Sequence, residues 1–234
     1  KTFRPQAVTR IYSADKQLLA KLYLEKRDPV GLDSIPFYLK AALIATEDRK
    51  FYSHSGIHLK GIARALIKDI LAGEFVEGAS TITQQLAKTL FLTSRKTVVR
   101  KIKEAILAFQ LERRYTKDEI LELYLNQVYF GSGAYGVKSA AEIFFNKSVG
   151  ELNLAECALI AGMPKSPSRY SPLINEGLAL KRRNIVLRQM RTAGIINAKD
   201  YNQALAETIQ LGKKSKNVTR APYFVEYVKK HLED

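Results

Sequence analysis

The sequence predicts a mainly α-helical protein with a short β element near its N-terminus. Apolar residues recur at helical spacing from Pro36 onward, several of these helices open with capping patterns, and a β-branched and aromatic segment precedes them. Hydrophobic residues fill 46% of the 234 positions. That share is enough for one sizeable core and excludes a largely disordered chain.

The first 35 residues predict a hairpin that leads into the helical part. "VTRIYSADKQLLAKLYL" places β-branched and aromatic residues on either side of a turn at Ala14-Asp15-Lys16. We therefore treat 1–35 as a lead-in, 36–212 as the main domain, and 213–234 as a tail with a different role.

The helices of the main domain are predicted from periodicity and from their ends. "PFYLKAALIATED" is apolar around most of its circumference, as a buried helix should be, and residues 62–71 form a second apolar stripe that ends near Gly73. Glycine at 194 should stop the basic helix "LALKRRNIVLRQMRTAG", and another helix is expected over 198–208. "AGEFVEGAS" and "MPKSPSRYSP" fit no regular element. Capping-box spacing marks three further helix starts, at Thr116, Ser148 and Asn153.

Charge and cysteine content restrict the partners. Lys and Arg number 38 against 23 Asp and Glu, and the resulting charge of +15 predicts a nucleic acid, a membrane surface or a phosphorylated substrate as partner. The single cysteine, Cys157, lies in an apolar helical run and is expected to be a buried small hydrophobe. No apolar run approaches the roughly 20 residues of a membrane span. Because the sequence starts at Lys1 without an initiator methionine, we expect a membrane anchor to precede it.

The first candidate site is the carboxylate pair Glu47 and Asp48. An apolar helix ends at this pair, and partial removal from water would suit Glu47 to proton transfer. The alternative is a loop cap or a pair with Arg49. His54 and His58 are four residues apart, but the intervening Gly56 argues against a helical metal site. His54 is expected to hydrogen-bond within its own turn.

The second candidate site is "GASTITQQLAKTLF", residues 78–91, with Lys88 one turn into the predicted helix. A helix start with exposed N–H groups and hydroxyls is suited to an anion. Capping alone is the simpler alternative, but it does not need so many polar side chains, so we favour a site. The preceding stretch, 73–80, is expected to be poorly ordered without ligand. The polar side chains in question are Ser80, Thr81, Thr83, Gln84 and Gln85.

The third candidate site is the helix "KTVVRKIKEAILAFQLERR". Val98, Val99, Ile102, Ala105, Ile106 and Phe109 share about a third of its circumference, and Glu104 lies between Arg100 and Lys101 on the opposite side. Such pairs usually mark a solvated face. Together with Lys88, Arg95 and Lys96, however, this concentration of positive charge would suit a diphosphate leaving group. A nucleic-acid-binding stripe is the other interpretation.

Five blocks in order give a resemblance to a known family: "EDRKFYSHSG", "GASTITQQ", "RKIKE", "KDEILELYLN" and "RRNIVL". They resemble the glycosyltransferase domain (glycosyltransferase family 51) of bacterial peptidoglycan polymerases, the class A penicillin-binding proteins and their monofunctional relatives. The similarity extends over nearly the whole chain, and the tail resembles the start of a linker to a transpeptidase domain.

This resemblance implies a lysozyme-like fold with two lobes, one of them facing the membrane, and a cleft between them. The implied reaction joins lipid II units into glycan strands, processively, with inversion at the anomeric carbon and release of undecaprenyl diphosphate. The implied partners are lipid II, the growing glycan strand, the membrane surface and the inhibitor moenomycin, and not nucleic acid. The implied place is the outer face of the bacterial cytoplasmic membrane.

The resemblance also implies roles for individual residues. Glu47 would be the general base acting on the 4-hydroxyl of the acceptor sugar. Glu104 would be a second catalytic carboxylate that orients or stabilises the diphosphate region, and it is the one candidate to hold a divalent cation, Mg²⁺ or Mn²⁺. Asn126, Arg182 and Arg183 would be scaffold. The residues expected to contact substrate are Asp48, Ser80, Thr81, Gln84, Gln85, Lys88, Lys96, Arg100 and Lys101.

Two other functions stay open at this point. A muramidase-like hydrolase would share the fold and a catalytic Glu, but it would not need the cations around Glu104. A basic helical nucleic-acid-binding module would account for the charge but not for "EDRKF" or "STITQQ".

Overall fold

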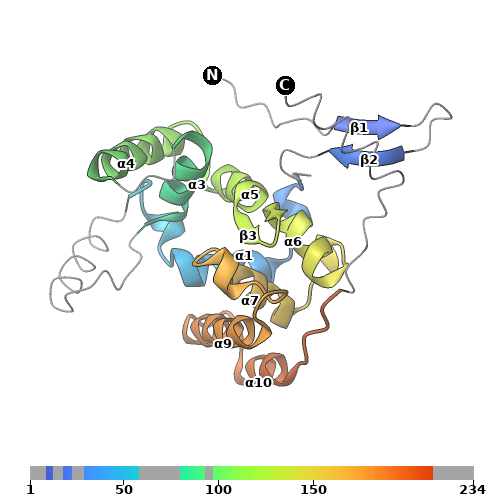
Figure 1. Ribbon diagram of the computed structural model, residues 1–234. Coiled ribbons are helices and arrows are strands. Elements are labelled where there is room, and N and C mark those ends of the chain that lie inside the picture. Colours follow the sequence, from blue (N-terminus) through green and yellow to red (C-terminus); the bar gives the residue numbers. More distant parts are fainter. Residues whose placement is uncertain (1–8, 13–17, 23–28, 58–79, 93–96, 213–234) are drawn as a thin grey trace.

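The computed structural model describes residues 9–12, 18–22, 29–57, 80–92 and 97–212. Figure 1 shows a mainly helical body, which confirms the predicted fold class. The α-helices are α1 (Phe37–Glu47), α3 (Ile82–Phe91), α4 (Val98–Glu112), α5 (Lys117–Gln127), α6 (Gly136–Phe145), α7 (Leu154–Gly162), α8 (Pro167–Tyr170), α9 (Glu176–Thr192) and α10 (Ala198–Ala206). The short elements are β1 (Thr9–Tyr12), β2 (Leu18–Leu22), β3 (Tyr129–Gly131), β4 (Ala134–Tyr135) and the 3-10 turns η1 (Leu32–Ser34), η2 (Phe51–Ser53) and η3 (Val149–Glu151).

The centre of the helical body is formed by α1 and α7. They pack against each other and against α9, while α3 packs on α4 and α5 (Figure 1). In α7 every side chain from Ala155 to Gly162 is buried, and in α1 Leu39 and Leu43 are fully enclosed. Burial on nearly all sides explains why α7 is apolar around most of its circumference, whereas Phe37 and Tyr38 at the start of α1 stay exposed. The position of α1 brings the carboxylate at its C-terminal end, Glu47, into the interior of the fold.

Local sequence signals account for most helix ends. The capping boxes at Thr116, Ser148 and Asn153 are all present, although the one at Ser148 opens a 3-10 turn. Gly194 adopts a left-handed φ of 72° just after α9, where residues other than glycine would be strained. The predicted N-terminal hairpin is confirmed, because β1 and β2 pair antiparallel.

Two short elements were not predicted. The antiparallel pair of β3 and β4 closes over a turn in which Gly131, Ser132 and Gly133 all have positive φ. The proline-rich segment contains the four-residue helix α8, which begins on Pro167, because a first helical position needs no N–H donor. The helix and the loop expected over 62–80 lie outside the described residues, except for Ser80.

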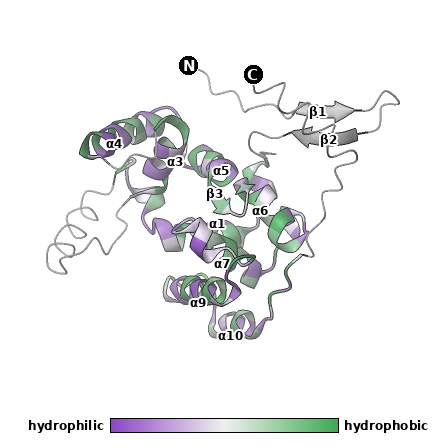
Figure 2. Cartoon of the chain, in the orientation of Figure 1, coloured by the Kyte–Doolittle hydropathy of each residue, from purple (hydrophilic) through white to green (hydrophobic). Residues whose placement is uncertain are grey.

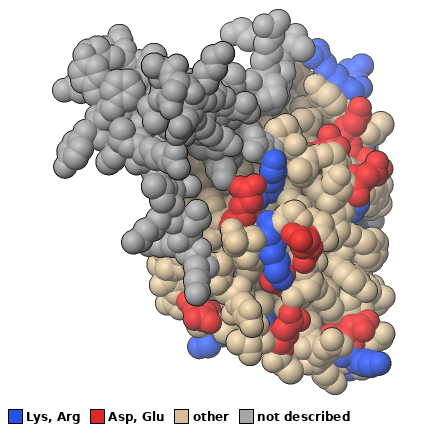
Figure 3. All heavy atoms as spheres, turned by 90° about the vertical axis from the view of Figure 1, so that its right-hand side faces the viewer, with Lys and Arg blue, Asp and Glu red and all other residues tan. Residues whose placement is uncertain are grey.

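Acidic and basic side chains are mixed on one face of the molecule. On the face drawn in Figure 3, Lys and Arg side chains lie beside Asp and Glu rather than forming a continuous basic strip. Within the described residues, no helix is long and apolar enough to span a membrane.

Candidate active site

Glu47 lies where three helices meet. It is the last residue of α1, and its Oε2 accepts a hydrogen bond of 3.0 Å from Nε2 of Gln85 on α3. Its Oε1 lies 3.7 Å from Nη2 of Arg182 on α9, and 12% of its side chain is exposed. Glu47 is therefore a carboxylate that is held from two sides yet still open to solvent.

Arg182 is fixed by the groups around it. Its Nε donates to the carbonyl of Gly162 over 3.0 Å, and its guanidinium lies 5.7 Å from the centre of the Tyr170 ring. Only 7% of its side chain is exposed. The resemblance implied a scaffold role for Arg182, and the structure adds direct proximity to Glu47.

Asp48 faces different partners from Glu47. Its Oδ2 accepts the backbone N–H of Ile82 at 3.1 Å and lies 2.8 Å from Nε2 of His54. Because Nδ1 of His54 accepts the N–H of Gly56, the ring proton belongs on Nε2, where it points at Asp48. This confirms that His54 bonds within its own turn; His58 lies outside the described residues. Asp48 is buried, and its contact with substrate stays a prediction.

The polar cluster at the start of α3 divides into two groups. Thr81 and Gln84 form a capping box at the helix N-terminus, and the Thr81 hydroxyl also donates to the carbonyl of Gly56. Thr83 donates to Glu112. These three side chains are at most 2% exposed. The hydrogen bonds of Thr81 and Gln84 therefore close the helix end, and their contact with substrate stays a prediction.

Ser80 and Gln85 are the members of this cluster that reach the site. The Ser80 hydroxyl accepts from Nζ of Lys101 at 2.6 Å. Gln85 donates to Glu47 and accepts, through Oε1, from the hydroxyl of Tyr124 at 3.0 Å. Lys88, one turn further along α3, is exposed.

Glu104 is a buried carboxylate that holds two cations. It is 2% exposed, Lys101 Nζ contacts its Oε1, and Arg100 Nη1 lies 3.5 Å from its Oε2. Within the described part of the chain, the buried Nε of Arg100 makes no hydrogen bond. Since both oxygens of Glu104 face cations, this carboxylate does not fit a divalent metal, and the described residues contain no cluster of three His, Cys, Asp or Glu that could hold one. Lys96 lies outside those residues.

The orientation of α4 is the reverse of that expected for a soluble amphipathic helix. Glu104, Ala108 and Leu111 face the protein, whereas most side chains of the predicted apolar stripe are exposed. Figure 2 shows hydrophobic and hydrophilic residues alternating along α4. The exposed fractions are 78% for Val98, 62% for Val99, 56% for Ile102, 54% for Ile106 and 49% for Phe109. This inversion places the charged side of α4 next to Ser80, at the start of α3.

Both acids therefore border the same helix start. Glu47 contacts α3 through Gln85, and Glu104 is linked to it through Lys101 and Ser80. Asn126 and Arg183 have the structural roles that the resemblance implied. Asn126 binds both backbone groups of Val30, and Arg183 donates to the carbonyls of Leu205 and Glu207.

Sequence reasoning gave no role to Tyr124. It is fully buried in α5, and burial, assisted by the nearby charge of Glu47, raises the pKa of its phenol well above the ordinary value. In the sequence it stands among apolar residues of "ILELYLN", a pattern that is typical of a core position. Only the hydrogen bond to Gln85 separates it from an ordinary core tyrosine.

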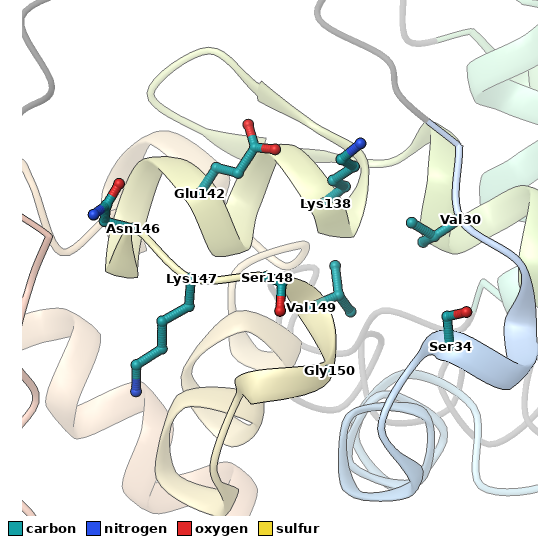
Figure 4. A pocket seen from close by; sticks show the side chains of 9 residues that line it. All are labelled: Val30, Ser34, Lys138, Glu142, Asn146, Lys147, Ser148, Val149 and Gly150. Carbon is teal, nitrogen blue, oxygen red and sulfur yellow. The ribbon is translucent and has the colours of Figure 1, made fainter.

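A pocket of about 460 Å³ lies elsewhere, between α6, η3 and the segment around η1 (Figure 4). Val30 and Ser34 line one side of it, and Lys138 and Glu142 line the other. Its lining contains none of the predicted site residues, so it is separate from the site around Glu47.

Comparison with known proteins identifies the class. The family model described as Transglycosylase matches residues 15–191, and this chain belongs to that family. Over 99% of its own length, this chain is 45% identical to penicillin-binding protein 1A of Aquifex aeolicus. Over 95% of its own length, it is 46% identical to penicillin-binding protein 1F of Bacillus subtilis. It spans 32% and 31% of those relatives.

A solved structure agrees with these relatives. The crystal structure of penicillin-binding protein 1A from Haemophilus influenzae superimposes with a TM-score of 0.61 at 30% identity, covering 99% of this chain and 25% of that one. The resemblance found in the five sequence blocks is confirmed.

Proposed function

We propose that this chain is a processive peptidoglycan glycosyltransferase that polymerises lipid II with inversion and releases undecaprenyl diphosphate. The observation that carries this proposal is the arrangement around α3. A partly exposed carboxylate, Glu47, and a cationic cluster around Glu104 border one helix start. Membership in the transglycosylase family supports the same reaction.

In this proposal Glu47 removes the proton from the acceptor sugar's 4-hydroxyl as that oxygen attacks the anomeric carbon. The contacts to Gln85 and Arg182 fix the direction of the carboxylate. A base must lie within hydrogen-bond reach of the proton it takes, so a fixed direction contributes to the rate.

The cationic cluster serves the leaving group. Lys101 is half exposed, Lys88 is exposed, and Arg100 keeps an unused buried donor within the described residues. Fixed positive charge stabilises the charge that develops on a departing diphosphate. Glu104 holds Arg100 and Lys101 in place, which fits the orienting role that the resemblance implied.

We also propose that the exposed apolar face of α4 rests on the membrane that carries the lipid-linked substrate. A helix with an apolar outer face and cations nearby is suited to a membrane surface, and the net charge of +15 favours an anionic one. This supports a location at a membrane surface, and the resemblance implies the outer face of the bacterial cytoplasmic membrane. Inhibition by moenomycin, a divalent cation requirement and a transpeptidase domain beyond residue 234 stay predictions.

The test is an assay with purified lipid II, with and without Mg²⁺. Glu47→Gln should lower polymerisation by at least about a thousandfold while circular dichroism and melting temperature stay unchanged, because the amide cannot accept the proton. Glu176→Gln, the same change at an exposed position of α9, is the matched control and should retain activity. Normal glycan synthesis by Glu47→Gln would refute the assignment of the base.

A lysozyme-like muramidase is the second candidate, because a carboxylate such as Glu47 also suits hydrolysis. Hydrolysis does not explain the cations around Glu104, because cleavage of a glycosidic bond between sugars releases no diphosphate. Incubation with finished peptidoglycan separates the two reactions, and release of muropeptides would favour the hydrolase. Salt-sensitive DNA binding tighter than binding to lipid II would instead favour a nucleic-acid-binding module.

A further inference from the structure

We propose that Tyr124 is a positioning residue for the base: its hydroxyl fixes the side-chain amide of Gln85, and that amide aims Glu47. This inference rests on the proposed function and extends it to a buried residue of α5. It starts from two hydrogen bonds in series, Tyr124 Oη to Gln85 Oε1 at 3.0 Å and Gln85 Nε2 to Glu47 Oε2 at 3.0 Å.

The chemistry of the three groups gives this series a direction. An ionised carboxylate only accepts hydrogen bonds, so Gln85 must turn its NH₂ group toward Glu47. Its carbonyl oxygen then faces Tyr124, where only a donor fits. A phenol meets this condition as long as it keeps its proton.

The surroundings of Tyr124 keep it a donor. The side chain is 1% exposed, so no bulk water competes for the hydroxyl. Burial and the nearby charge of Glu47 both raise the pKa of the phenol well above its ordinary value, so the proton is retained at neutral pH.

Without Tyr124 the amide would lose its preferred orientation. The two ends of a glutamine amide are nearly equal in size, so packing alone does not select one of the two orientations. A flipped Gln85 would place its carbonyl oxygen against the Glu47 carboxylate and push that side chain away. Glu47 would then spend part of its time out of line with the acceptor hydroxyl.

The experiment measures kcat and KM for lipid II polymerisation by Tyr124→Phe, which removes the hydroxyl alone. We expect kcat to fall about three- to tenfold, the size of one lost hydrogen bond, with KM within about twofold. Tyr201→Phe in α10, whose ring packs on Arg191, is the matched control and should keep wild-type kinetics. A Tyr124→Phe variant with wild-type kcat would overturn the proposal.

A double-mutant cycle with Gln85→Met tests whether Tyr124 acts through Gln85. Tyr124→Phe should lower kcat in the wild-type background and change it by less than about twofold when Gln85 is already Met. An equal loss in both backgrounds would mean a general packing effect and would overturn the inference. If wild-type protein makes no glycan from lipid II, the proposed function fails, whereas a failed cycle in an active enzyme removes only the role of Tyr124.

A further measurement on folded wild-type protein does not depend on how the variants behave. The side-chain amide protons of Gln85, assigned in NMR spectra by their loss in Gln85→Met, should exchange with water at least about tenfold more slowly than those of the exposed Gln110. Equal exchange rates would show an unfixed amide and would contradict the proposal.

Discussion

At the scale of single residues, the site depends on which atoms each acid faces. Glu47 and Asp48 are neighbours in sequence, yet one contacts Gln85 and Arg182 while the other binds His54 and the start of α3. The sequence shows the pair of carboxylates. Their different partners follow from the end of α1, where the two side chains point in different directions.

The contact between Arg182 and Gly162 gives a prediction for Gly162→Ala. A Cβ at this position would lie 2.8 Å from Cγ of Arg182 and 3.3 Å from a methyl group of Val186. We expect the variant to lose about 1–3 kcal/mol of unfolding free energy, despite the better helix propensity of alanine, because overpacking displaces Arg182. Activity should fall as well, since Arg182 would move relative to Glu47.

Urea unfolding and lipid II turnover check this prediction. Gly150→Ala is the control, because a Cβ there meets nothing within 4 Å. A Gly162→Ala protein with wild-type stability and turnover would show that Arg182 is not tightly confined.

Cys157 provides a second prediction at this scale. Burial is the main cause that raises the pKa of its thiol to about 12, so the reactive thiolate is nearly absent at neutral pH. The folded protein should fail to react with a disulfide reagent such as DTNB over an hour at pH 8, and the urea-unfolded protein should release one equivalent. Rapid reaction of the folded protein would contradict the expected role of Cys157 as a buried hydrophobe.

At the scale of elements, the start of α3 joins stability and chemistry within a few residues. Thr81, Thr83 and Gln84 satisfy the helix end and neighbouring groups from inside. Ser80 instead contacts Lys101, and Gln85 contacts Glu47. The count of polar side chains suggested a site from sequence. It could not separate these groups, because burial depends on where α1 and α4 pack.

This separation predicts opposite effects for Thr81→Ala and Ser80→Ala. Thr81→Ala should reduce the free energy of unfolding by about 1–3 kcal/mol, since it removes a cap and leaves the buried carbonyl of Gly56 without its donor. Ser80→Ala should leave stability within about 0.5 kcal/mol and weaken turnover of lipid II.

Thermal and urea unfolding measure stability, and the lipid II assay measures turnover. Thr116→Ala, at an exposed capping box, is the control for stability. The control should lose less than Thr81→Ala, because its hydroxyl has water as a substitute partner. If Thr81→Ala kept full stability and lost only activity, Thr81 would be a substrate contact after all.

At the scale of the whole molecule, the inverted orientation of α4 decides both the site and the outer surface. Turning Glu104 inward assembles the cationic cluster, and the same rotation exposes Val98, Ile102 and Ile106. Periodicity correctly predicted that α4 has an apolar face and a charged face. It did not predict which of these two faces packs against the rest of the protein. In water the apolar face would be buried, so its exposure is informative about a partner.

We therefore predict that Ile102→Ser with Ile106→Ser weakens binding to vesicles that contain anionic lipid. Loss of two exposed isoleucines should reduce the partition coefficient by about tenfold or more, through lost apolar burial in the bilayer surface. Vesicle sedimentation at low and high salt measures the change. Ile174→Ser with Ile185→Ser, two exposed isoleucines outside α4, is the control and should bind as wild type. Equal losses in both variants would contradict a specific role for α4.

The sequence by itself determined the helical class, the capping boxes, the buried helix that ends at Glu47 and the family. Local sequence patterns predict these features, because periodicity and capping depend on residues within a few turns of one another. The tertiary structure decided which side of α4 points inward, which polar residues of α3 are caps, and that Arg182 and Tyr124 converge on Glu47. The contacts that Gln85, Tyr124 and Arg182 make around Glu47 join residues from 38 to 135 positions apart in the chain. Only the packing of whole helices determines which of these residues meet.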